Sequence, residues 1–251
     1  MNRTRLACLL LTPAALVLTS LAAAAEPYRE TFDQSYNLAP GGRVALTNVN
    51  GDVQVGVWDQ PTVRVQAVKE ADTPEGLEKL RIEVAASASA VEIQTRYPRH
   101  TDDHLSVAYT LTVPRDAALD TFELVNGGLS AGGVLGKVRA RLVNGEARLA
   151  ALAGDVDVHT VNGELSIELA RLDPARQVEL ETVNGSVELR LPAAAGADVH
   201  AETVNGHLGN DFGIAVNKHE HVGADMIGAI GGGGASVKLR SVNGTIRLTK
   251  L

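Results

Sequence analysis

The sequence predicts an all-β fold, a single-stranded β-solenoid or β-helix-like repeat domain. Three observations predict it. An Asn-Gly pair recurs along the chain, apolar and polar residues alternate on both sides of each pair, and hairpins at these pairs would bring like charges together. Alternation with a period of two is typical of strands that bury one face. Units of roughly twenty residues are too short for two helices and fit two strands with two turns.

Residues 1–25 have the layout of a cleavable secretory signal peptide. Arg3 and Arg5 form a basic start, an apolar run follows, and small residues precede an expected cut after Ala25. Cys8 comes before the apolar run and has Arg5 three places ahead of it, so we do not expect lipid attachment. After cleavage no segment is long and apolar enough to span a membrane, and the expected location is periplasmic or secreted.

Residues 26–251 are expected to form one β-strand-repeat domain, less regular at 26–120 and regular at 121–251. In the first part, residues 63–68, 89–95 and 106–113 alternate as strands do. Residues 74–80 begin with proline and contain helix-forming residues, which predicts one short helix. Asn50 already carries the repeat motif, so the two parts are expected to be continuous.

The repeat is marked by seven Asn-Gly pairs, and a valine precedes each of them to give the motif V-N-G. From Asn126 onward the intervals are 18, 18, 22, 21 and 38 residues. The last interval is close to two repeats, so one unit is expected to have lost its marker near the glycine-rich residues 228–234. The predicted structural corners are Asn50, Gly51, Asn126, Gly127, Asn144, Gly145, Asn162, Gly163, Asn184, Gly185, Asn205, Gly206, Asn243 and Gly244.

Two arrangements fit this pattern: a meander of hairpins with type I′ turns, or a solenoid in which like positions of successive coils stack about 4.8 Å apart. A hairpin would place like charges opposite one another, which is unfavourable: Glu181 with Glu188, Arg141 with Arg148, and Arg240 with Arg247. A solenoid instead predicts two mostly complementary rows: Arg141, His159 and Glu181 in one, and Glu168, Arg190 and Asp211 in the other. The charges therefore favour the solenoid.

The motifs also carry a family resemblance. They are LTNVNGDVQVGVWD at 46–59, YTLTVP at 109–114, and the series LVNG, TVNG and SVNG between residues 124 and 244. Together they resemble a bacterial putative-adhesin family of β-strand-repeat domains of unknown function. The resemblance covers nearly all of the mature chain. It implies an exported or envelope β-solenoid and brings no catalytic residues.

Composition excludes several function classes. The formal net charge is −7, and loss of the two arginines in the signal peptide makes the mature chain more acidic. A basic face for nucleic acid is therefore not expected. Aromatic residues make up only 3% of the chain, so stacking platforms for bases or sugars are scarce. Cys8 is the only cysteine, so the mature chain has no disulfide and no thiol chemistry.

Two histidine-containing segments are candidate metal ligands. His219 and His221 would project to one side of an extended segment and could share Zn²⁺ or Cu²⁺. The sequence identifies no third ligand, so a solvated loop is the preferred interpretation. Residues 99–104, RHTDDH, combine two histidines with two carboxylates, and here too a polar loop between strands is favoured. We predict no metal site and no cofactor.

Catalytic motifs for hydrolases, metalloproteases and nucleotide-binding enzymes do not occur in the sequence. A carbohydrate-active enzyme, a lyase or glycosidase of β-helix type, would have to use residues such as Arg139, Arg141, Asp157 or Glu179. Trp58 could contact a sugar, but a tryptophan at a strand end is more typical of packing or capping. The repeated Asn side chains are expected to bond to one another along a column, which gives them a structural role.

The function predicted from the sequence is an exported, non-enzymatic cell-envelope solenoid that acts as a scaffold or adhesin-like binding surface. Its partner would be an unknown envelope protein or glycan, because repeat proteins present long rigid faces. The alternatives are the carbohydrate-active enzyme and a self-assembling envelope protein that joins copies through open solenoid ends.

Overall fold

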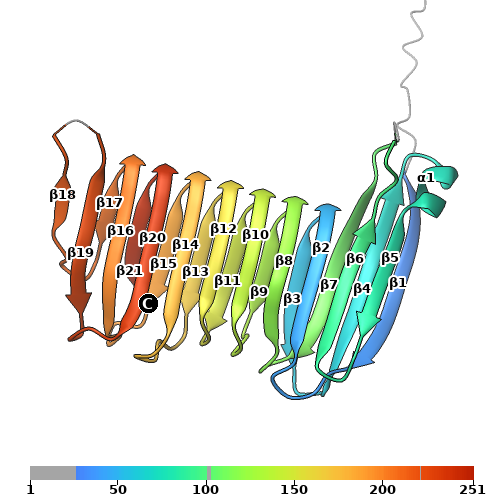
Figure 1. Cartoon of the computed structure of the whole chain (residues 1–251), viewed down its shortest axis with the longest axis horizontal. Coiled ribbons are helices and arrows are strands. Elements are labelled where there is room, and N and C mark those ends of the chain that lie inside the picture. The colour runs from blue at the N-terminus through green and yellow to red at the C-terminus, as the bar shows by residue number, and fades with distance from the viewer. Residues whose placement is uncertain (1–26, 101–102, 221) are drawn as a thin grey trace, which may run out of the picture.

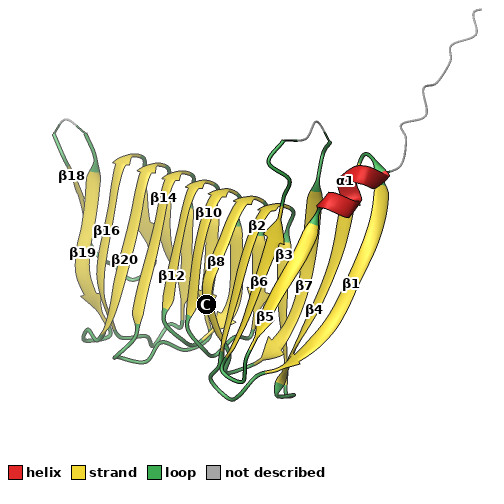
Figure 2. Cartoon of the chain, turned by 45° about the vertical axis from the view of Figure 1, so that its right-hand side comes forward, coloured by secondary structure: helices red, strands yellow, loops and turns green. Residues whose placement is uncertain are grey.

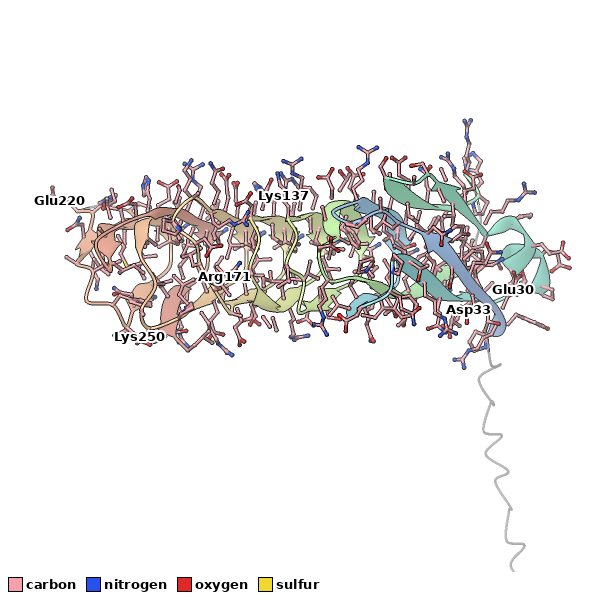
Figure 3. The ribbon with its side chains drawn as sticks, turned by 90° about the horizontal axis from the view of Figure 1, so that it is seen from below. Glu30, Asp33, Lys137, Arg171, Glu220 and Lys250 are labelled. Carbon is pink, nitrogen blue, oxygen red and sulfur yellow. The ribbon has the colours of Figure 1, made fainter. Side chains whose placement is uncertain are left out.

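The computed structural model describes residues 27–100, 103–220 and 222–251, so the predicted signal peptide lies outside the described residues. Strands stand side by side in a long row, with the helix α1 (Pro74–Lys79) at one end (Figure 1). Seen from below, the row has two layers with side chains between them (Figure 3). We call the ten-stranded layer sheet A and the eleven-stranded layer sheet B. The predicted all-β class and the one short helix are confirmed.

Each Asn-Gly pair follows a strand of sheet B and leads into a strand of sheet A, which together form one coil. The seven coils are β2 (Arg43–Asn50) with β3 (Val53–Trp58), β8 (Ala118–Asn126) with β9 (Leu129–Gly132), β10 (Val138–Asn144) with β11 (Ala147–Leu152), β12 (Val156–Asn162) with β13 (Leu165–Leu169), β14 (Gln177–Asn184) with β15 (Val187–Leu191), β16 (Ala197–Asn205) with β17 (Leu208–Asn210), and β20 (Ala235–Asn243) with β21 (Ile246–Lys250).

Neighbouring coils pair in parallel and in register. In sheet B, Val156 lies beside Val138 on one side and Val178 on the other, and in sheet A Leu165 lies beside Ala147 and Val187. The two strands around an Asn-Gly pair therefore belong to different sheets and do not form a hairpin. The solenoid-like arrangement is confirmed.

The predicted charge rows are partly right. Arg141, His159 and Glu181 occupy neighbouring positions on three adjacent strands of sheet B. In sheet A, however, Arg190 lies beside Thr249, so the predicted neighbour Asp211 is wrong.

The order of coils in space explains this error. The last coil, β20 and β21, lies between the β14–β15 coil and the β16–β17 coil. The residues expected to form a degenerate coil instead form β18 (Val216–Lys218) and β19 (Ala224–Ile230), and β19 runs antiparallel to β16 on its outer side. Residues 231–234 are four glycines with positive φ, and they return the chain into the gap between the two earlier coils.

Further strands extend both sheets at the N-terminal end (Figure 2). The first added strand of each sheet pairs in parallel with the first coil, and the strands beyond it pair antiparallel. Sheet A adds β7 (Ser106–Pro114), β4 (Thr62–Ala71) and β1 (Tyr28–Asn37), and sheet B adds β6 (Ala90–Arg96) and β5 (Arg81–Ala86). Helix α1 begins after Thr73, whose hydroxyl accepts a hydrogen bond from the N–H of Gly76. No helix within the described part of the chain is long and apolar enough to span a bilayer.

The core fills the space between the two sheets from end to end. Inward residues alternate with outward ones along each strand, so that Val158, Leu180, Ile167 and Leu189 are all almost fully buried. Each aliphatic side chain of this size contributes about 1.5–3 kcal/mol when removed from water. The core therefore runs through every coil and holds the two sheets together.

Candidate functional site

The corners of the coils form one hydrogen-bonded column along the upper edge of Figure 1, which we call the Asn column. Except at Asn50, which begins the column, each amide nitrogen Nδ2 donates to the Oδ1 atom of the asparagine before it in the stack at 2.8–3.0 Å. Parallel strands in register place identical side chains one strand spacing apart, which allows such a column. In spatial order, its members are Asn50, Asn126, Asn144, Asn162, Asn184, Asn243 and Asn205.

Glycine follows each of these asparagines because the backbones approach closely there. A Cβ atom at Gly163 would lie 1.9 Å from the carbonyl oxygen of Gly145, and one at Gly185 would lie 1.8 Å from that of Gly163. The same carbonyl of Gly163 accepts a hydrogen bond from the hydroxyl of Thr182 at 3.2 Å. Among the seven corner pairs only Gly51 and Gly185 have positive φ, so the close approach, rather than a left-handed turn, is what requires glycine.

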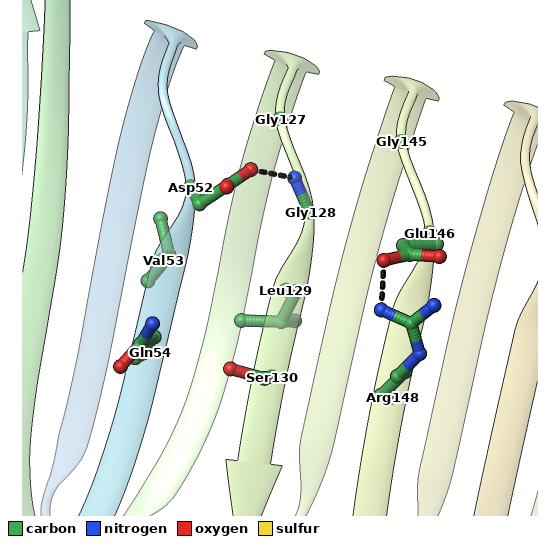
Figure 4. A pocket seen from close by; sticks show the side chains of 10 residues that line it. All are labelled: Asp52, Val53, Gln54, Gly127, Gly128, Leu129, Ser130, Gly145, Glu146 and Arg148. Atoms are coloured by element: carbon green, nitrogen blue, oxygen red, sulfur yellow. Dashed lines mark hydrogen bonds and ion pairs between the residues drawn. The ribbon is translucent and has the colours of Figure 1, made fainter.

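A trough lies on the outer face of sheet A, where β9 runs between β3 and β11 (Figure 4). It consists of two adjoining hollows of about 320 and 350 Å³ that share Gln54, Ser130 and Arg148. On one side the carboxylate of Asp52 accepts a hydrogen bond from the N–H of Gly128 at 2.7 Å. On the other, Arg148 forms an ion pair with Glu146. The walls therefore offer charged and neutral hydrogen-bonding groups.

The floor of the trough is open because two outward positions of its strands, Gly56 on β3 and Gly132 on β9, carry no side chain. A Cβ atom at Gly132 would meet nothing within 4 Å, and one at Gly56 would meet only a carbonyl oxygen at 4.0 Å. Neither residue has positive φ, so the backbone does not require glycine at either place. Glycine in a strand costs about 0.5–1 kcal/mol relative to alanine and often marks close approach of a ligand. This site was not predicted from the sequence, although the glycine-rich run GGLSAGG at 127–133 includes part of its open floor.

The residues considered for catalysis lie together on the outer face of sheet B, and Asp157 forms ion pairs with both arginines. Asp157 lies 3.0 Å from Arg139 Nε and 2.9 Å from Arg141 Nη1, and Glu179 occupies the neighbouring position on β14. Burial raises the pKa of Asp157, but the hydrogen bonds and charges of Arg141 and Arg139 outweigh it and the pKa is lowered. A carboxyl that serves as a general acid needs the opposite shift.

The histidine candidates also bond to carboxylates. His219 Nε2 lies 2.5 Å from Asp225 Oδ1, and this hydrogen bond is the main reason that the pKa of Asp225 is lowered. His221 lies outside the described residues. His104 Nδ1 lies 2.8 Å from Asp72 Oδ2 in the loop that follows residues 101–102. No group of three or more metal-ligating side chains occurs among the residues that the structure describes.

Trp58 ends strand β3 at the lower edge of the molecule, opposite the Asn column. Its indole N–H donates to the carbonyl oxygen of Thr62 at 2.7 Å, across the turn that joins β3 to β4. The expected capping contact is therefore present. The indole also lines a separate hollow of about 310 Å³.

Comparison with known proteins supports the fold. Residues 129–249 match the family model described as Toastrack DUF4097. The solved structure of a putative cell adhesion protein from Clostridium sporogenes is 12% identical to this chain, with 88% of this chain and 100% of the other covered and a TM-score of 0.51. A putative adhesin from Bacteroides fragilis is 11% identical over 91% of this chain and 100% of its own, with a TM-score of 0.39. No curated protein matches the chain. The resemblance drawn from the repeated motifs is confirmed.

Proposed function

Starting from the Toastrack domain at residues 129–249, we propose that the protein is an exported, non-enzymatic scaffold of the cell envelope with an adhesin-like binding surface. The predicted signal peptide supports export. The observation that carries the proposal is the continuity of the molecule. One hydrogen-bonded column and one core run through all seven coils, so the outer faces form a long rigid surface.

The V-N-G corners hold this scaffold together. Inside the Asn column each residue uses one amide proton and its carbonyl oxygen to bond to its neighbours, for example Asn162 to Asn144 and Asn184 to Asn162. The adjacent glycines allow the backbones to approach. We therefore assign the fourteen corner residues a structural role and place ligand binding elsewhere.

The binding surface that we favour is the trough across β3, β9 and β11. The glycines of its open floor, Gly56 and Gly132, reduce the stability of their strands, although a side chain would fit at both positions. Its walls supply carboxylate, amide, hydroxyl and guanidinium groups from Asp52, Gln54, Ser130 and Arg148. This is the chemistry that recognises an extended, polar envelope polymer or a polar segment of an envelope protein.

The enzyme alternative receives little support. Every described carboxyl group whose pKa is shifted is shifted downward, and each one is hydrogen-bonded to an arginine or a histidine: Asp33, Asp72, Asp157 and Asp225. Glycoside hydrolysis by an acid and a base instead needs one carboxyl that stays protonated.

Self-assembly through the ends is also opposed. At the N-terminal end, Lys69 is only 10% exposed and forms an ion pair at 2.8 Å with Glu30 of the edge strand β1. Charged groups near an edge that face the core resist pairing with another chain. At the other end the edge strands β17 and β18 have three residues each, which leaves little backbone to extend.

Co-sedimentation with isolated envelope material tests the proposal. The purified mature chain is expected to bind peptidoglycan sacculi or outer-membrane vesicles. Ser130→Arg, which fills the trough, should weaken binding at least tenfold without lowering the melting temperature. Ser166→Arg is the matched control, because Ser166 occupies the equivalent outward position on β13, two strands away. Absence of binding to both materials, or equal loss in both variants, would contradict the proposal.

A panel of soluble glycans separates this proposal from the enzyme alternative. The purified chain should release no product from polyuronates, glucans or peptidoglycan fragments over long incubation. Turnover that disappears in Asp157→Asn would favour the enzyme.

A further inference from the structure

We propose that Trp58 and the hollow beside it form a binding site for one pyranose ring of an envelope glycan. This inference rests on the proposed function and names the class of ligand for a second site on the same molecule. The hollow lies at the lower edge, where the loops after β1, β3 and β7 meet. Its volume of about 310 Å³ lies at the small end of the range for ligand pockets.

The indole is a rigid platform. Its only hydrogen-bond donor is already engaged by the carbonyl oxygen of Thr62 at 2.7 Å, so the ring orientation is fixed and the rest of its surface is apolar. Pro114 occupies the register position beside Trp58 on β7, and Pro40 and Pro61 line the same hollow. Proline rings have a fixed backbone angle and no N–H group, so these walls are apolar and keep their shape.

The rim of the hollow is polar and has hydrogen-bonding capacity left for a ligand. Arg115 Nε donates to Asp59 Oδ1 at 2.8 Å, and the side chain of Asp59 is 83% exposed. Asp116 Oδ2 accepts a hydrogen bond from the N–H of Gly41 at 2.8 Å. Each carboxylate has a second oxygen and further lone pairs, and the guanidinium has further N–H groups. The rim can therefore accept hydrogen bonds from some hydroxyl groups and donate to others.

A pyranose ring matches this combination. Its C–H face is apolar and packs flat against an indole, while its hydroxyl groups radiate around the ring and need both donors and acceptors. Ligand sites usually combine such an apolar floor with a few well-placed polar groups. Asp59 and Arg115 supply both kinds of partner at one edge of the platform.

A proline-rich peptide is the other ligand that a tryptophan–proline hollow suggests, and it fits less well. Such peptides dock in grooves lined by several aromatic residues, and their exposed backbone carbonyls need donors. Here one aromatic residue lines the hollow, and its N–H is committed to Thr62. The sugar needs neither a second ring nor the indole N–H.

The test uses the protein's own fluorescence, because Trp58 is the only tryptophan in the sequence. The purified mature chain is titrated with chito-, cello- and malto-oligosaccharides and with peptidoglycan glycan strands freed of peptide. At least one of these saccharides should produce a saturable change in tryptophan emission. Arg115→Gln should raise the apparent Kd about tenfold, the effect of losing a hydrogen bond to a charged group.

The controls separate this site from the trough and from misfolding. Arg247→Gln removes an exposed arginine from the outer face of sheet A, near the opposite end of the sheet, and should leave the titration unchanged. Ser130→Arg, in the trough, should also leave it unchanged. Trp58→Phe removes the fluorescence signal but keeps an aromatic ring, so its binding is followed by calorimetry and should be weaker than that of the native chain.

The outcomes are distinct from those of the proposed function. An emission change produced by a proline-rich peptide and by none of the saccharides overturns the inference. So does a chain that binds sacculi but shows no emission change with any saccharide, and in that case the proposed function stands. Saccharide binding at Trp58 in a chain that does not bind envelope material supports this site and removes the scaffold proposal.

Discussion

Replacement of Asn184 by alanine should destabilise the protein, because it removes two hydrogen bonds from the Asn column. Asn184 Nδ2 donates to Asn162 Oδ1 at 2.9 Å, and Asn184 Oδ1 accepts from Asn243 Nδ2 at 2.8 Å. Each hydrogen bond contributes about 0.5–1.5 kcal/mol net. Both partners are exposed and can bond to water after the change, so the free energy of unfolding should fall by about 1–2 kcal/mol. For a chain of this size this corresponds to a loss of about 2–8 °C in Tm.

Thermal denaturation followed by circular dichroism measures this loss, and Asn205→Ala is its matched control. Asn205 ends the column and makes one column bond, to Asn243 at 3.0 Å, so its replacement should cost about half as much. Asn184→Asp should cost at least as much as Asn184→Ala, because it replaces the amide donor that faces Asn162 with a charged acceptor. Equal losses for Asn184→Ala and Asn205→Ala, or no loss for either, would refute the reasoning.

Three further predictions concern backbone and charge. Gly163→Ala should destabilise the protein by several kcal/mol, because its Cβ atom would lie 1.9 Å from the carbonyl oxygen of Gly145. Gly132→Ala should be neutral or stabilise the protein by up to about 1 kcal/mol, because its Cβ atom would meet nothing. Urea denaturation compares the two variants, and equal effects would contradict the distinction between corner and trough glycines. Thr121 has a φ of 68°, which is costly for a β-branched residue. Thr121→Gly should therefore raise the free energy of unfolding by about 1 kcal/mol in the same assay. A lower value would show that the backbone of Thr121 is not strained. The pKa of Asp157 is lowered in the fold. Its stabilising contribution is therefore present above its unfolded pKa of about 3.9 and is lost as pH falls through the lower folded value. Asp157→Asn should make the free energy of unfolding less dependent on pH below about pH 4, and an unchanged pH profile would count against the ion-pair cluster.

Much of the fold could be predicted from local pattern. Alternation around Asn162 and Asn184 identified the inward residues, because a strand with one buried face permits no other arrangement. The charge row of Arg141, His159 and Glu181 was predicted correctly, since it depends only on coils that are adjacent in sequence.

The order of the last coils could not be predicted in the same way. Intervals between Asn-Gly pairs give the length of a coil but not its place in the stack. The last coil has the same pattern as the others, so it fits the gap between Asn184 and Asn205 as well as a position at the end. Residues 231–234 give the only indication of a sharp return, and their sequence does not show where the chain returns to.

The candidate surfaces were hidden for a different reason. The trough is defined by side chains that are missing, at Gly56 and Gly132, and a glycine in the sequence does not show whether its backbone or its surroundings require it. At the corners, an Asn-Gly pair is typical of positive φ, whereas the structure shows that the carbonyl of the neighbouring coil excludes a side chain. The surroundings of Trp58 come from three separate loops, which no local pattern brings together.

The most direct test of the account is a parallel measurement of Tm and of binding to envelope material for Asn184→Ala and Ser130→Arg. We assign the Asn column a structural role and the trough a binding role. Asn184→Ala should therefore lower Tm and keep the affinity of the folded protein, whereas Ser130→Arg should keep Tm and weaken binding. Loss of binding in Asn184→Ala at an unchanged Tm would contradict it, because the Asn column would then be the functional surface.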